Sequence, residues 1–173
     1  MLFVTAGSLM LALGSGCSST DGVQQEPSKP LRIGADGSVS VAFPAPRSVY
    51  TDASVALCRL STEPATLVSL SAPAGSDLRV TDFDVVKIGS GFSSEPKPLS
   101  SIKRWESLNR VVNDPCGTDA DELLAIEYTK DASADEASAK YFTLTYQVDG
   151  EQFEDQVKFA VKICTKFAGC KSS

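Results

Sequence analysis

Residues 141–164 read YFTLTYQVDGEQFEDQVKFAVKIC, and this stretch decides the fold. Apolar side chains recur at every second position before and after Asp149-Gly150. A period of two is typical of β-strands with one buried face, and Asp-Gly between two such runs is a strong hairpin signal. We therefore predict a hairpin, with a bulge or the outer end of the second strand at Asp155, which interrupts the inward series. The inward residues are Phe142, Leu144, Tyr146, Val148, Phe153, Val157, Phe159, Val161 and Ile163.

Shorter apolar runs upstream predict the remaining strands. Turn-forming Gly, Pro, Ser and Asp clusters separate these runs, and many short strands at such spacing favour a β-sandwich over an α/β fold. The alternation changes parity near Thr81-Asp82, which predicts a kink there. Residues 31–33 are expected to pair with residues 39–43 across Asp36-Gly37. The predicted strands are residues 39–43, 54–60, 65–70, 78–88 and 123–128, about seven with the hairpin.

Two segments are predicted to be loops. Residues 133–140 (SADEASAK) contain good helix formers but no apolar face. Residues 89–104 (GSGFSSEPKPLSSIKR) are rich in Pro and Ser. Loops of this length without secondary structure are uncommon and are often functional.

The chain begins with an uncharged segment, residues 1–16 (MLFVTAGSLMLALGSG), directly before Cys17. Its apolar part, residues 2–13, is shorter than the roughly 20 residues that span about 30 Å of hydrocarbon, so it fits an export signal better than a membrane anchor. The segment resembles the lipobox of bacterial lipoproteins, although Gly14 occupies a position where Leu is usual and no Lys or Arg precedes Lys29. The resemblance implies cleavage before Cys17 and acylation of its thiol, for example with palmitate. An ordinary secreted protein cut near Gly16 is the alternative.

Residues 18–30 are polar, with two prolines, and cannot bury enough apolar surface to offset their ordering entropy. The predicted organisation is a lipoprotein signal peptide at 1–16, a lipidated N-terminus with a disordered, flexible tether at 17–30, and one β-sandwich domain at 31–173. The protein would then face the extracytoplasmic side of a bacterial cell membrane, anchored by lipid at Cys17.

Five cysteines are present, and assigning Cys17 to lipid leaves an even set. The remaining cysteines are predicted to form disulfides, because an exported domain meets an oxidising environment. The absence of a C-x-x-C pair disfavours zinc binding and thiol redox catalysis. Pairing Cys164 and Cys170 back to Cys58 and Cys116 would close larger loops and stabilise more, and we favour it over a small Cys164–Cys170 ring.

The net charge is −6 and histidine is absent. An acidic domain is a poor partner for nucleic acid. Without histidine the chain has no Ser-His-Asp or Cys-His arrangement and no imidazole metal ligand. We therefore expect no enzyme activity, cofactor or metal. The acidic residues Asp114, Asp119, Asp121 and Glu122 fit no recognisable Ca²⁺-loop spacing.

The order of features is similar to that of small actinobacterial-type lipoproteins of unknown function. The matching pieces are VALC at 55–58, EPATLVSL at 63–70, LRVTDFDVV at 78–86, Cys116-Gly117 shortly before LLAIEY at 123–128, and VKIC at 161–164. The resemblance covers residues 55–164 and implies an immunoglobulin-like antiparallel β-sandwich. It implies no activity, and Cys170 lies outside the pattern.

The best predicted contact surface lies in residues 89–110 and comprises Phe92, Lys97, Lys103, Arg104 and Trp105. A tryptophan among basic residues can anchor an interface, although it can equally cap a sandwich core. The predicted function is a binding or accessory module whose partner is an envelope protein or a cell-wall component. The alternatives are a solute-binding receptor, a hydrolytic enzyme without histidine, and a structural subunit of an envelope complex.

Overall fold

The computed structural model describes residues 29–34, 37–42, 49–89, 93–117, 121–131, 133–165 and 170. The predicted signal peptide at 1–16, Cys17, residues 18–28 of the predicted tether and Phe92 lie outside these residues, so the expectations for them stay predictions. In the described part, no helix is long and apolar enough to cross a membrane.

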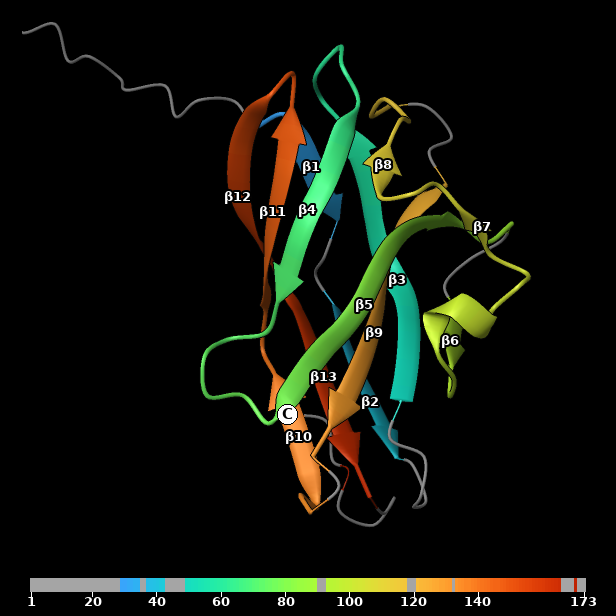
Figure 1. Ribbon diagram of the computed structural model, residues 1–173, viewed down its shortest axis with the longest axis vertical. Coiled ribbons are helices and arrows are strands. Elements are labelled where there is room, and N and C mark those ends of the chain that lie inside the picture. The colour runs from blue at the N-terminus through green and yellow to red at the C-terminus, as the bar shows by residue number, and fades with distance from the viewer. Residues whose placement is uncertain are drawn as a thin grey trace, which may run out of the picture.

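The first sheet is antiparallel, in the order β1-β3-β9-β5-β7, with β6 also beside β3 (Figure 1). Its register shifts between Val80 and Asp82, which confirms the kink predicted at this point. The strands are β1 (Leu31–Gly34), β3 (Val49–Arg59), β5 (Leu78–Lys87), β6 (Ser93–Glu95), β7 (Glu106–Ser107) and β9 (Glu122–Lys130).

The predicted hairpin is confirmed and is longer than expected. Its first arm is β10 (Glu136–Ala139) and β11 (Phe142–Val148), and its second is β12 (Glu151–Val157) and β13 (Phe159–Cys164). Both turn residues, Asp149 and Gly150, have positive φ, as a tight hairpin turn requires. Between the pairs 139↔161 and 142↔157, the second arm contains one extra residue, which is a bulge.

No bulge lies at Asp155, contrary to one of the two expectations for it. Asp155 pairs in register with Leu144, and its carboxylate accepts a hydrogen bond from the Tyr146 hydroxyl at 3.1 Å and contacts the Lys29 ammonium. Because these two partners satisfy the carboxylate, it can occupy an inward position without interrupting the pairing.

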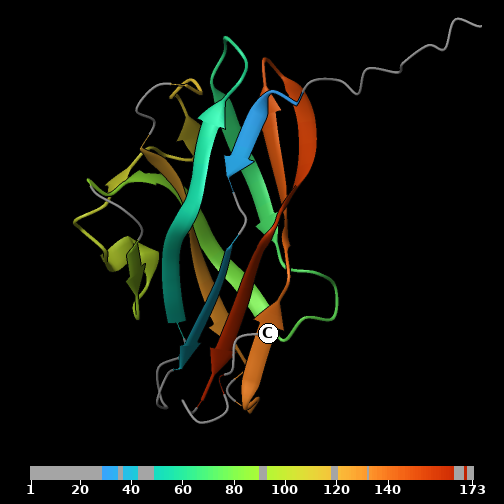
Figure 2. The same cartoon turned by 180° about the vertical axis from the view of Figure 1, so that it is seen from behind.

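The second layer is built around this hairpin. Strand β4 (Ala65–Ser71) pairs antiparallel with β11, β8 (Val111–Val112) pairs with β4, and β2 (Gly37–Ala42) runs parallel to β13. The two layers lie face to face (Figures 1 and 2). One layer has the order β1-β3-β9-β5 and the other β2, hairpin, β4, which is the strand arrangement of the immunoglobulin fold. The predicted all-β sandwich is confirmed.

Aromatic side chains fill the space between the layers. Tyr128 of β9 and Phe142 and Tyr146 of the hairpin are fully buried. The Tyr128 and Phe142 ring centroids are 5.5 Å apart, so this pair joins the two sheets directly. Aromatic pairs of this kind contribute about 0.5–1.5 kcal/mol beyond the burial of their area.

Three expectations about local structure were wrong. Residues 31–33 and 39–43 do not pair, since β1 joins β3 and β2 joins β13 in the other layer. Residues 136–139 form strand β10 rather than a loop, because the small side chains of Ala137 and Ala139 alternate inward and are buried. The segment 89–104 contains β6 and a 3-10 helix, η1 (Leu99–Ser101).

The disulfides are Cys58–Cys116 and Cys164–Cys170, so the favoured cross-pairing was wrong. The reason is topological. Cys58 lies near the end of β3, where the Arg59 amide donates to the Asp114 carbonyl and the Cys116 amide donates to the Arg59 carbonyl, both at 2.9 Å. Cys164 ends β13 at the opposite pole (Figure 1).

The two disulfides are expected to differ in their contribution to stability. Their sequence separations are 58 and 6 residues. By loop-closure entropy, the longer loop is worth about 4 kcal/mol and the shorter about 2 kcal/mol. Denaturant unfolding of Cys58→Ala/Cys116→Ala and of Cys164→Ala/Cys170→Ala, without reductant, measures both losses. A larger loss for the second pair would contradict this ranking.

Candidate functional site

The connection between β5 and β9 is a long insertion that folds onto the outer face of the first sheet. Strand β6 lies beside β3, β7 beside β5, and β8 beside β4 of the other sheet. Beneath the insertion is a second apolar cluster, separate from the sandwich core, made by Ala53, Val86, Ile102, Trp105, Leu123 and Ala125. The insertion is therefore a packed cover rather than the unstructured loop that its composition indicated.

Trp105 belongs to this second cluster and is only 7% exposed. This position fits the interpretation of Trp105 as a core residue better than that of an exposed interface anchor. Its indole nitrogen has no hydrogen-bond partner among the described residues. The indole packs from the insertion onto the outer face of the first sheet.

An open groove of about 520 Å³ lies where the insertion meets β5. One wall is the outer face of β5, and the other comes from η1 and the segments that follow it. The lining residues are Asp82, Phe83, Asp84, Val86, Leu99, Ser100, Ile102, Lys103, Trp105, Ser107, Asn109 and Arg110.

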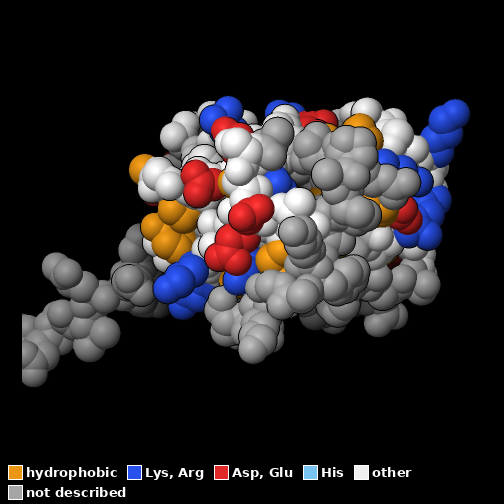
Figure 3. All heavy atoms as spheres, turned by 90° about the horizontal axis from the view of Figure 1, so that it is seen from below, with side chains coloured by type: hydrophobic (Ala, Val, Ile, Leu, Met, Phe, Trp, Pro, Cys, Tyr) orange, Lys and Arg blue, Asp and Glu red, His pale blue; other side chains and the backbone are white. Residues whose placement is uncertain are grey.

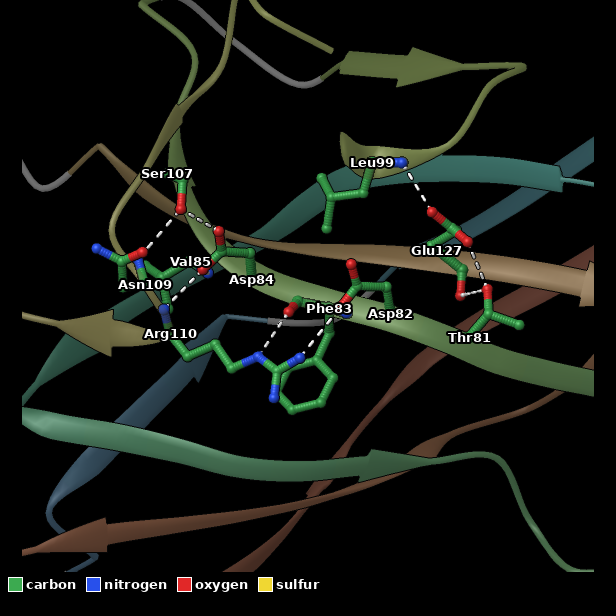
Figure 4. Close-up of polar contacts among 10 residues, drawn as sticks. All are labelled: Thr81, Asp82, Phe83, Asp84, Val85, Leu99, Ser107, Asn109, Arg110 and Glu127. Carbon is green, nitrogen blue, oxygen red and sulfur yellow. Dashed lines mark hydrogen bonds and ion pairs between the residues drawn. The ribbon is translucent and has the colours of Figure 1, made fainter. Parts of the chain in front are cut away.

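Arg110 organises the groove (Figure 4). Its Nε donates to the Phe83 carbonyl and its guanidinium reaches the Asp82 carboxylate, both at 3.1 Å. The guanidinium carbon lies 4.1 Å from the centre of the Phe83 ring, within the range of a cation–π contact. On the other sheet, the Arg110 carbonyl accepts a hydrogen bond from the Leu67 amide at 2.8 Å. Arg110 thus contacts both β5 and β4.

The turn that carries Arg110 is strained. Asn109 and Arg110 have φ of 53° and 64°, in the left-handed region that L-residues other than Asn rarely occupy. Ser107 stabilises the turn, since its hydroxyl accepts from the Asn109 amide and donates to Asp84. The Asp84 carboxylate also accepts the Arg110 amide, at 2.6 Å.

These contacts also close the free edge of β5. The Phe83 and Val85 amides donate to the Asp82 and Asp84 carboxylates at 2.8 Å. The Val85 carbonyl accepts the Leu108 amide, also at 2.8 Å. An exposed strand edge is a template for unwanted pairing, so the polar groups of this turn protect the sheet.

The predicted contact residues divide between two places. Lys97 and Arg104 both pair with Glu95 of β6, Lys97 at 3.6 Å. Lys103 is exposed on the groove and takes part in none of the ion pairs among the described residues. The groove residues Asp82, Asp84 and Asn109 were not predicted. The only sequence signal for the two carboxylates is their outward parity in Asp82-Phe83-Asp84.

A second polar cluster lies under β6. Asp52 of β3 is 1% exposed, and its carboxylate accepts a hydrogen bond from the Ser94 hydroxyl at 2.5 Å. Burial raises the pKa of Asp52, and it raises the pKa of the neighbouring Tyr50 to about 12. Tyr50 stacks on Tyr128, whose buried hydroxyl has no partner among the described residues. Sequence reasoning did not single out this cluster.

The acidic residues near Cys116 are engaged with protein groups. Lys87 contacts Asp114 at 3.1 Å and Asp121 at 2.9 Å. Glu122 accepts the Asn113 and Asp114 amides at 2.8 and 3.0 Å, and burial raises its pKa. Asp119 lies outside the described residues. Within the described part of the chain, no group of His, Cys, Asp and Glu residues is arranged to hold a metal ion.

The lower pole shows a different surface. Viewed from below, acidic and basic side chains both occur on the described part of this face, and hydrophobic side chains lie in separate small patches (Figure 3). Large contiguous apolar patches are what mark stable protein interfaces. The described part of this face shows no such patch.

Comparison with models of known protein families finds none that matches, and comparison with curated proteins finds no similar chain.

Replacing Arg110 tests its role as a clamp. Arg110→Ala removes the bond to Phe83, the Asp82 pair and the ring contact, and we expect a loss of about 2 kcal/mol in the free energy of unfolding. Arg104→Ala is the matched control, because its exposed pair with Glu95 should contribute less than about 1 kcal/mol. Denaturant unfolding of both variants measures the difference, and equal losses would contradict the clamp.

The buried carboxylate predicts a pH effect. Because the pKa of Asp52 is raised in the folded state, its contribution is most favourable below its unfolded pKa of about 3.9 and is lost as the pH rises through the folded pKa. Asp52→Asn should therefore gain stability relative to the wild type as the pH increases from about 3.9. Unfolding curves across this range measure the difference, and Asp77→Asn, at an exposed aspartate, is the control. A constant difference would overturn the prediction.

Proposed function

We propose that this protein is a lipid-anchored binding or accessory module of the bacterial cell envelope, held at the extracytoplasmic side by acylated Cys17. The apolar leader that ends at Cys17 supports the anchor. The two disulfides support the compartment, because disulfides persist where the environment is oxidising. The resemblance to small actinobacterial-type lipoproteins points the same way.

The groove beside Arg110 is the observation that carries the binding role. Its walls are fixed by the Arg110 clamp and by the second apolar cluster. On its rim, the side chains of Ser100, Lys103 and Asn109 are exposed and make none of the hydrogen bonds found among the described residues. A rigid recess with unengaged polar groups can bind a partner at a small entropic cost. We infer that the partner is an envelope protein that inserts a side chain or a short segment.

The groove suits such a partner better than an enclosed solute. A receptor site buries most of its ligand and presents convergent polar groups. This groove opens widely to solvent, and the carboxylates of Asp82 and Asp84 are already bound to Arg110, to Ser107 and to backbone amides. Because both carboxylates are engaged in these contacts, neither is available as the base of a hydrolytic reaction.

The test is photo-crosslinking in the expressing bacterium, with a photoreactive amino acid in place of Lys103 in the full chain. We expect the protein in the membrane fraction with one discrete adduct. The same chain with Cys17→Ser should move to the soluble fraction and lose the adduct, because the anchor places the groove beside its partner.

A photoreactive residue at Glu63, which is exposed in the turn between β3 and β4, is the control and should give no adduct. Equal adducts at both positions would reject the groove. A Cys17→Ser protein that stays in the membrane fraction would reject the anchor. Stoichiometric co-purification with one complex, without dependence on Lys103, would favour the structural-subunit alternative.

A further inference from the structure

The outer face of the second sheet carries an ordered array of polar side chains. The registers of β4, β11 and β12 align nine residues in three rows across the strands. Seven of the nine side chains are exposed, and the other two, Thr143 and Thr145, are half-buried. We call this array the polar ladder. Its rows are Ser71–Thr143–Gln156, Ser69–Thr145–Glu154 and Thr66–Gln147–Gln152.

The polar ladder is almost uncharged, and no other described residue engages its side chains. Eight of its members bear a hydroxyl or an amide, which both donate and accept hydrogen bonds, and Glu154 is the one charged member. None of the side-chain hydrogen bonds or ion pairs found among the described residues involves any of the nine. The face therefore offers donors and acceptors to solvent or to a ligand.

The array is held rigidly. Strand β11 is paired on both edges, and its opposite face is anchored by Phe142, Leu144 and Tyr146, all with 0% exposure. The threonine side chains are β-branched and restricted at χ1. Neighbouring strands are roughly 4.8 Å apart, and successive rows are roughly 6.8 Å apart along β11 and β12. On β4 a bulge separates Ser69 from Thr66 by three residues, so the rows are less regular there. A ligand laid along β11 would therefore meet preorganised groups.

The chemistry of the face selects the class of ligand. At the edge of the ladder Lys29 and Lys158 lie beside Glu154 and Gln156, and Lys29 is paired with Asp155. A polyanion would meet Glu154 there and a chain of net charge −6. An apolar partner would find little to bury beyond Val68, which is 42% exposed beside the ladder. A neutral, hydroxyl-rich, extended ligand can satisfy the ladder without desolvating a charge. Two residues before Thr143, the half-buried Tyr141 continues the line Thr143–Thr145–Gln147 along the chain, and its ring can pack against a sugar.

We propose that the polar ladder binds a neutral polysaccharide, laid along β11. This site is separate from the groove and goes beyond the proposed function, which assigns a protein partner to the insertion. The module would then contact two components of its surroundings through two different sheets.

The test is affinity gel electrophoresis of the detergent-extracted full chain in gels containing a soluble mannan, an arabinogalactan or an α-glucan, with dextran sulfate as the charged comparison. We expect at least one neutral polysaccharide to retard the protein and dextran sulfate not to. Thr143→Val/Thr145→Val removes two hydroxyls but keeps shape and strand propensity. This double substitution should lower the affinity for the retarding polysaccharide about tenfold.

The matched control is Thr62→Val/Thr129→Val, which removes two hydroxyls away from the ladder, and it should bind as the wild type does. Thermal unfolding of both variants verifies that they are folded. The proposal would be overturned if none of the three neutral polysaccharides retards the wild type, if dextran sulfate alone retards it, or if both variants lose binding equally. A Lys103 variant should bind polysaccharide normally, so failure here is distinguishable from failure of the groove.

Discussion

At the open side of the sandwich Arg110 contacts both sheets, in a segment where Leu108 also binds β5 and β8 pairs with β4. Arg110 binds β5 through its side chain and β4 through its carbonyl, and its left-handed backbone makes both contacts possible at once. The position of the insertion, the shape of the groove and the protected edge of β5 all depend on this arrangement. A feature that limits unwanted pairing of strands therefore also builds the candidate site, and a change at Arg110 would affect both.

The hairpin has the corresponding role in the other layer. Its bulge divides each arm into two strands, so one continuous hairpin supports β4 in its upper half and β2 in its lower half (Figure 1). Its inward residues make the aromatic core, while its outward residues form the polar ladder. The first sheet is covered by the insertion and the second is left open, so the two faces of the domain differ in chemistry.

The sequence predicted most where one physical signal was strong. Period-two alternation around Asp149-Gly150 identified the hairpin, and the parity change at Thr81 identified the kink. It failed where the outcome depended on distant partners. The alanines of β10 are too small to mark a strand, and nothing local shows that β1 and β2 belong to different sheets. The groove was not predicted because it depends on left-handed φ at Asn109 and Arg110. Neither residue type by itself indicates that conformation at these positions.

The division of the N-terminal strand between the two sheets has a mechanical consequence. Strand β1 is hydrogen-bonded to β3 and β2 to β13, so the first described segment is paired with both layers. Interstrand hydrogen bonds run across the strands. A pull on the chain before residue 29, directed along β1, would load these bonds in shear and all together, instead of peeling them one by one. The fold is therefore expected to resist traction applied before β1.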